Sequence, residues 1–192
     1  MCIRDRAAMM NGIALHGGLI PFGGTFLVFS DYERPALRLA AIQKIRVLHE
    51  FTHDSFYVGE DGPTHQPIEH AMSLRAIPEF NVFRPADAKE TAVCFKIAIA
   101  NQSIPSALLL TRQGVPVLEK EINEVEKLVS KGGYIIKDCE GDPQIIIIAT
   151  GSEVSLAIQT AKLFNDRAVR VLSMPCIEIF NKQPQEYKNR IL

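Results

Sequence analysis

The sequence predicts an α/β fold, in which a mostly parallel sheet is flanked by helices and a second, truncated α/β domain follows. Short apolar segments with the character of strands alternate with segments whose apolar residues recur at helical spacing. This alternation is typical of a parallel sheet. It covers residues 7–113, breaks off in a polar and charged stretch at 114–132, and resumes over 133–192. The resumed part is too short to complete an α/β domain of ordinary size.

The first four elements alternate between helix and strand. Residues 7–16 are compatible with a helix that ends at Gly17, which can supply the cap. A short β-prone strand is expected at 25–29. A helix is expected over 32–44, where apolar side chains recur at helical spacing. The next strand candidate covers 45–51.

A loop then precedes two further elements. Residues 59–67 (GEDGPTHQP) contain two glycines and two prolines and no large apolar side chain, so they are expected to form a shaped loop. A helix is expected over 68–77, ending before Pro78, and a short strand over 80–83.

The last helix of this domain has a predicted cap. Asp87 is expected at its N-terminus, and Glu90, three residues further on, would complete a capping box. The helix then extends to about residue 100, and a buried strand is expected at 106–110.

The second domain follows the linker predicted at 114–132. We expect a strand at 145–149, a helix at 152–164 and a strand at 169–172. Residues 187–192 continue a helical pattern without a capping residue. The chain is therefore expected to be a piece of a longer protein.

Composition and charge argue against several classes of function. The 21 basic and 22 acidic residues are spread along the chain and give a net charge of −1. No basic cluster favours binding to nucleic acid or to an anionic membrane. The longest apolar runs are strand-sized and far short of a membrane span. The four cysteines form no CxxC pair, which argues against a zinc site or a disulfide framework and favours free thiols in the cytoplasm.

Candidate site residues follow three of the predicted strands. Phe29 ends one strand, His53 follows a second, and Arg112 follows a third. Ligands of open α/β sheets bind beyond the carboxyl ends of the strands, so these residues are expected to meet at one edge. The glycine- and proline-rich loop adds Asp61 and His65, whose side chains suit proton transfer and hydrogen bonding.

A metal site is an alternative interpretation of the polar residues. His53, Asp61, His65 and His70 fit no familiar zinc-binding spacing, and the glycines and prolines between them define no common helix face. No metal ligand is therefore expected in this chain.

Five segments match one protein family in order and at similar spacing, and the match spans residues 7–192. They are 25–29 (TFLVF), 52–55 (THDS), 59–67 (GEDGPTHQP), 111–113 (TRQ) and 149–154 (ATGSEV). In these segments the chain resembles the transketolases, thiamine-diphosphate enzymes that move two-carbon ketol units between sugar phosphates. The resemblance implies a pyrimidine-binding domain at 7–113, the linker at 114–132 and a partial C-terminal domain at 133–192.

The resemblance also implies roles for three aromatic residues. Phe29 is expected to stack on the aminopyrimidine ring of thiamine diphosphate, and Phe26 and Tyr32 to line the same pocket. A flat heterocycle prefers an offset aromatic neighbour. Plain core packing is the ordinary alternative for three aromatic side chains at this spacing.

The polar candidates are implied to contact the substrate. His65 is expected to act as the catalytic residue, beside the hydroxyl group of the sugar that undergoes cleavage. His53 and Arg112 stand where the family binds phosphate, and Asp61 where an acid hydrogen-bonds a sugar hydroxyl. A surface histidine, a solvated arginine and a turn-forming aspartate are the ordinary alternatives.

Two features of the family are missing from the sequence. The glutamate that protonates the aminopyrimidine ring would fall at about position 3, but the residue there is Ile3, within a tail at 1–6 that matches nothing in the family. The Gly-Asp-Gly and Asn motif that binds diphosphate and Mg²⁺ is also absent, and 141–143 (GDP) does not replace it. We therefore expect this polypeptide to be part of an enzyme that uses thiamine diphosphate and Mg²⁺. On its own it is expected to be inactive.

Three alternatives to transketolase stay open. Dihydroxyacetone synthase shares most of the motifs, whereas 1-deoxyxylulose-5-phosphate synthase fits less well at 52–55 and at Glu60. A non-catalytic module for dimerisation or ligand binding could be built on the same fold. For a transketolase, the resemblance implies sugar phosphate substrates, a role in the pentose phosphate pathway, and a homodimer with the active site at the subunit interface.

Overall fold

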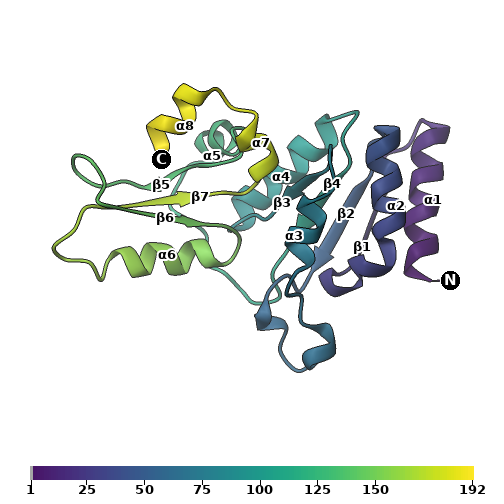
Figure 1. Ribbon diagram of the computed structural model, residues 1–192, viewed down its shortest axis with the longest axis horizontal. Helices are drawn as coiled ribbons and strands as arrows, with labels where there is room; N and C mark the ends of the chain where they lie inside the picture. The colour runs from purple at the N-terminus through teal and green to yellow at the C-terminus, as the bar shows by residue number, and fades with distance from the viewer. Residues whose placement is uncertain (1) are drawn as a thin grey trace. The chain divides into compact units, whose positions relative to one another are not determined.

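The computed structural model describes residues 2–192, which form two compact units (Figure 1). The first unit contains the residues up to Phe83 together with Phe95–Gly114. The second contains Arg84–Cys94 and Val115–Leu192. None of the helices in residues 2–192 combines the length and the apolar character that crossing a bilayer requires. All four cysteines are free thiols.

The sheet of the first unit confirms the predicted α/β fold. Its strands are β1 (Phe22–Phe26), β2 (Leu48–Thr52), β3 (Asn81–Phe83) and β4 (Ser106–Leu109). They pair in the order β1-β2-β4-β3, and every pair is parallel. All four residues of β4 are buried, as expected of an interior strand in a parallel sheet covered on both faces.

Strand β1 differs from the prediction. The strand expected at 25–29 lies at Phe22–Phe26, and the next three residues form a short 3-10 helix, η1 (Leu27–Phe29). Gly23 and Gly24 conceal the strand in the sequence, because glycine weakens a strand pattern. Gly24 also permits a close approach, since a Cβ there would lie 3.3 Å from the carbonyl oxygen of Glu50 on β2. Phe29 therefore lies beyond the end of the strand.

The helices of the first unit are close to their predicted positions. They are α1 (Ile3–His16), α2 (Ser30–Gln43), η2 (Phe56–Val58), η3 (Pro63–His65), α3 (His70–Arg75) and the second half of α4 (Ala88–Ala100). Helix α1 packs against α2 and β1, and α2 contacts both η1 and α3. The helix expected over 68–77 is shorter at each end than predicted, and Ile68 ahead of it is 77% exposed.

One apolar core joins α2 and α3 to the sheet. Leu37 on α2, Phe51 on β2 and Leu74 on α3 belong to it, and each is at most 1% exposed. Burying a side chain of this size stabilises the fold by roughly 1.5–3 kcal/mol. This core fixes the positions of the segments that follow β1 and β2.

The second unit contains a three-stranded mixed sheet in the order β5-β7-β6. Its strands are β5 (Tyr134–Lys137), β6 (Ile145–Ala149) and β7 (Val169–Ser173); β6 is parallel to β7 and β5 is antiparallel to it. Its helices, besides the first half of α4, are α5 (Ile122–Val129), α6 (Glu153–Ala161), α7 (Ile177–Asn181) and α8 (Gln185–Ile191). Helix α5 lies within the stretch expected to be a linker.

A buried carboxylate organises the second unit. The N–H group of Glu90 donates to Asp87 Oδ1 at 2.8 Å, so Asp87 caps α4 as predicted. The side chain of Glu90 does not complete the expected capping box. It accepts hydrogen bonds from the N–H group of Ala86 and the hydroxyls of Tyr134 and Ser173, at 2.7, 2.8 and 2.6 Å. Burial raises the pKa of Glu90, although these three donors favour its charged form.

Candidate active site

The carboxyl ends of β1, β2 and β4 lie side by side, because the three strands are adjacent and parallel. Helix η1 follows β1, His53 follows β2 directly, and Arg112 comes shortly after β4. A hydrogen bond of 3.2 Å from the N–H group of Asp54 to the carbonyl oxygen of Leu110 ties the ends of β2 and β4 together. The three segments therefore meet at one edge of the sheet, as the sequence predicts.

Five rings gather at this edge. Phe26 stacks on His53, with 3.7 Å between the ring centroids, and lies edge-on to His65 at 6.2 Å. Phe29 lies edge-on to His65 at 5.4 Å and is 6.1 Å from Tyr32. All five side chains are ones that the sequence singles out, and the structure brings them into a single cluster.

The exposure of the aromatic rings favours a binding surface over plain core packing. Phe26 and Phe29 are half-buried, and Tyr32 is 62% exposed. Core aromatic residues of the same unit are different, since Phe51 and Phe80 are each 1% exposed. Phe26, Phe29 and Tyr32 thus keep part of their surface accessible, which is what a site for a flat heterocycle needs.

His53 has an unusual backbone conformation. Its φ of 59° lies in the left-handed region, which costs a residue other than glycine roughly 1–3 kcal/mol. Its Nδ1 is 3.0 Å from the hydroxyl of the preceding Thr52. Such strain persists only where surrounding contacts hold it, and it is typical of functional sites.

The loop at 59–67 packs beside Arg112. Gly59 has a φ of 90°, and a Cβ added there would lie 3.1 Å from Cζ of Arg112. The exposed guanidinium group therefore lies directly against the backbone of the loop. The positive φ favours glycine at this position, and a Cβ there would also push the Arg112 side chain aside by a few tenths of an ångström.

The same loop carries His65 and Asp61. Pro63 begins η3, and His65 ends it with Nδ1 3.0 Å from the hydroxyl of Thr64. Asp61 is exposed and lies just before Gly62, which has a φ of 80°. The single turn of η3 directs His65 toward Phe26 and Phe29.

A pocket of about 480 Å³, which no motif in the sequence marks, adjoins the ring cluster at Tyr32. It is lined by Tyr32 and by the start of α1, namely Cys2, Ile3 and Arg4. The only sign of it in the sequence is that the family's glutamate would fall at about position 3. The side chain of Ile3 in this lining has no proton to donate to a ligand.

Within the described part of the chain, His53, Asp61, His65 and His70 do not form a common group of metal ligands. His53 and His65 belong to the ring cluster, whereas His70 faces Asp31 and Glu69. Within residues 2–192, Asp31, Glu69 and His70 form the one group able to offer three such ligands to an ion. Nothing in the sequence marks Asp31 or Glu69, because the three residues share no motif.

Comparison with known proteins assigns both units to families. Residues 5–117 match the family model described as the transketolase pyrimidine-binding domain. Residues 132–192 match the model of the transketolase-like C-terminal domain.

Relatives and solved structures agree with these matches. "Transketolase 2" of Aliivibrio fischeri is 49% identical over 187 residues, which cover 96% of this chain and 28% of that protein. The structure of the transketolase from Leishmania mexicana matches with a TM-score of 0.93 and 45% identity, over 98% of this chain and 28% of that one. A structure described as an inactive β4 tetramer of a split-gene transketolase matches with a TM-score of 0.76 and 27% identity, over 91% of this chain and 55% of that one.

This chain spans a little over a quarter of the length of the curated relatives. The first family model nevertheless covers more than half of the chain, and the second covers most of the rest. The chain therefore belongs to the transketolase family.

Proposed function

We propose that this chain is part of an enzyme that transfers a two-carbon ketol unit from a ketose phosphate to an aldose phosphate, with thiamine diphosphate as cofactor. The observation that carries this proposal is the cluster of Phe26, Phe29, Tyr32, His53 and His65 at the carboxyl edge of a parallel sheet. The names of the relatives support the reaction class.

The residues of the cluster fit the aminopyrimidine ring of the cofactor. Phe29 stacks on this ring, and Phe26 and Tyr32 line the pocket. The accessible surface of the half-buried rings and the adjoining pocket at Ile3 support this assignment. When bound, thiamine diphosphate supplies the nucleophilic carbon and the electron sink for cleavage of a carbon–carbon bond.

The polar residues at the edge bind and orient the sugar phosphate. His65, in contact with Phe26 and Phe29, hydrogen-bonds the hydroxyl next to the bond that breaks and moves its proton. Arg112 and His53 hold the phosphate group, for which the planar guanidinium fork of arginine is suited. Asp61 accepts a hydrogen bond from a hydroxyl between these two ends of the substrate.

The remaining parts of the enzyme are assigned to residues outside this chain. The 192 residues contain no Gly-Asp-Gly motif, so we assign them no ligand for the diphosphate or for Mg²⁺. We further infer a cytoplasmic homodimer with its active site at the subunit interface, acting in the pentose phosphate pathway. Free thiols support the cytoplasm. Exposed apolar side chains on and after α1, including Leu15, Leu19 and Phe22, support an interface.

Two variants of the full-length parent test the assigned roles. Arg112→Ala should lower kcat/KM about 10- to 100-fold for xylulose 5-phosphate, because a charge-assisted contact to phosphate is lost. It should change little for hydroxypyruvate, which carries no phosphate. His65→Ala should lower kcat/KM for both donors, because both need proton transfer at the same place.

Arg167→Ala is the matched control, since Arg167 is an exposed arginine in the loop before β7. It should leave both donors unaffected. Equal losses on both donors for Arg112→Ala would contradict the phosphate role and indicate an arginine that supports the loop through Gly59.

A further inference from the structure

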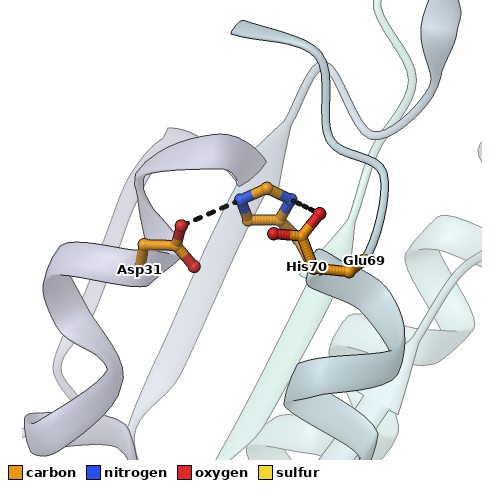
Figure 2. A group of neighbouring side chains, drawn as sticks. All are labelled: Asp31, Glu69 and His70. Carbon is orange, nitrogen blue, oxygen red and sulfur yellow. Dashed lines mark ion pairs between the residues drawn. The ribbon is translucent and has the colours of Figure 1, made fainter. Parts of the chain in front are cut away.

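Three side chains meet between α2 and α3 (Figure 2). His70 is only 5% exposed, and its ring lies between the carboxylates of Asp31 and Glu69, one facing each nitrogen. Nε2 is 3.3 Å from Oδ2 of Asp31, and Nδ1 is 3.9 Å from Oε2 of Glu69. The two carboxylates are largely exposed, at 58% and 71%.

The buried ring lacks the partners that a neutral histidine needs. Both nitrogens of His70 are inaccessible to solvent, and neither makes a hydrogen bond. A neutral imidazole has one N–H group and one lone pair, so one of the two facing carboxylates meets a lone pair. A buried polar atom without a partner is costly. A cation between the lone pair and a carboxylate removes that cost.

The spacing of the ligand atoms suits a metal ion. Two ligands at about 2.0–2.1 Å from a tetrahedral metal lie about 3.3 Å apart. The 3.3 Å between Nε2 of His70 and Oδ2 of Asp31 matches this separation and exceeds the usual N–H···O length. One ligand atom from each of the three residues lies within 4.8 Å of the others. Glu69 faces Nδ1 and is 71% exposed, so its side chain would have to turn toward an ion bound between Nε2 and Asp31.

The helices hold two of the ligands in place. Arg34, one turn after Asp31 on α2, donates to the carbonyl and hydroxyl oxygens of Ser73 at 2.7 and 2.9 Å. Ser73 in turn lies one turn after His70 on α3. This second tie fixes the spacing of Asp31 and His70 and directs the positive charge of Arg34 toward α3. A site built on helices in this way is pre-organised.

We propose that Asp31, Glu69 and His70 form a binding site for a divalent transition-metal ion. One imidazole and two carboxylates suit Zn²⁺, whereas Mg²⁺ and Ca²⁺ prefer oxygen ligands alone. Water completes the coordination on the exposed side. The proposal does not depend on the proposed reaction.

Titration calorimetry of the 192-residue chain with ZnSO₄, in a buffer that does not chelate zinc, tests the site. The wild-type chain should bind one equivalent whose affinity falls at least 10-fold in Asp31→Asn and in His70→Gln. Zn²⁺ should also raise the melting temperature of the wild-type chain and not that of Asp31→Asn. Because Asp31 is exposed, this variant is expected to fold even if His70→Gln does not.

Two control variants exclude other sources of zinc binding. Asp142→Asn removes an exposed carboxylate in the loop before β6, and Cys139→Ser removes a partly exposed thiol. Both should keep the wild-type affinity. Absence of zinc binding by the folded chain, or an affinity that Asp31→Asn leaves unchanged, would overturn the proposal.

Discussion

Ile3 is the residue at which this chain departs from what catalysis in its family is expected to require. It lies at the first position of α1 and lines a pocket with Tyr32. A carboxylic acid at position 3 would face an aminopyrimidine ring bound against Tyr32 and could share a proton with that ring. A glutamate is also favourable at a helix N-terminus, because it complements the helix dipole.

We predict that Ile3→Glu raises the activity of the full-length parent. A positioned acid contributes about 10²–10⁴-fold to rate, so an increase of about 100-fold in kcat is expected. Ile3→Gln is the matched control, because it has the same shape as the glutamate and no titratable proton. The measurement is kcat for ketol transfer at saturating cofactor. Equal rates for the two variants would show that position 3 does not serve the cofactor.

Glu90 predicts a pH dependence of stability. Burial raises its pKa above the ordinary 4.5, so the folded state holds this proton more tightly than the unfolded state does. The stabilisation is therefore complete below the unfolded pKa and is lost as the pH rises through the folded pKa. Between the two pKa values, the free energy of unfolding falls by about 1.4 kcal/mol per pH unit.

Urea unfolding of the wild-type chain and Glu90→Gln, from about pH 4 to 8, measures this effect. The wild-type chain should lose stability relative to the variant as the pH rises above the unfolded pKa. Glu140→Gln, at an exposed position, should show no such trend. A difference between wild type and Glu90→Gln that stays constant with pH would contradict the raised pKa.

At the scale of elements, the loop at 59–67 contains a matched pair of glycines. Gly59 and Gly62 both have positive φ, so alanine at either position is strained by about 1–3 kcal/mol. They differ in their surroundings, because a Cβ at Gly59 meets Arg112, whereas one at Gly62 meets nothing within 4 Å. Comparing alanine variants at the two positions therefore separates the effect of backbone strain from the effect of displacing Arg112.

We predict that both Gly59→Ala and Gly62→Ala lower the melting temperature, by similar amounts. Only Gly59→Ala should reduce the preference of the full-length parent for xylulose 5-phosphate over hydroxypyruvate, because only there is Arg112 displaced. The ratio of kcat/KM for the two donors is the measurement. Equal ratios in the two variants would show that the contact between Gly59 and Arg112 does not position a phosphate-binding group.

Some elements could be predicted from the sequence and others could not. The strands at 80–83 and 106–110 were recognisable, because apolar runs bounded by turn residues are strong local signals. The start of β1 was hidden by two glycines, whose pairing with β2 is a tertiary effect. Helix α5 lies within the predicted linker and is hard to recognise in the sequence, because charged residues stand between its four apolar ones and directly before it.

The candidate site shows the same division. Its five rings were identified from motifs, since they stand beside recognisable loops and strand ends. The left-handed backbone of His53 and the pocket at Ile3 depend on contacts between segments distant in sequence. The group of Asp31, Glu69 and His70 also forms only when α2 and α3 pack together. No pattern in the sequence records that packing.

At the scale of the whole molecule, two successive transketolase family models match residues 5–117 and 132–192. The rings and polar groups that we assign to the cofactor and the substrate all lie in the first unit. The residues that we infer to hold the diphosphate and Mg²⁺ are not among the 192. We expect a site divided in this way to bind one end of the cofactor and to leave the other end without a partner.

We therefore predict that the 192-residue chain alone catalyses no ketol transfer. Purified chain, shown to be folded by circular dichroism, is to be assayed with xylulose 5-phosphate, ribose 5-phosphate, thiamine diphosphate and Mg²⁺. A full-length transketolase in the same assay is the positive control. The prediction follows because Ile3 cannot donate a proton to the cofactor and because the diphosphate-binding motif is missing. Turnover above the control without protein would contradict it, by showing that the residues of this chain suffice to bind and activate the cofactor.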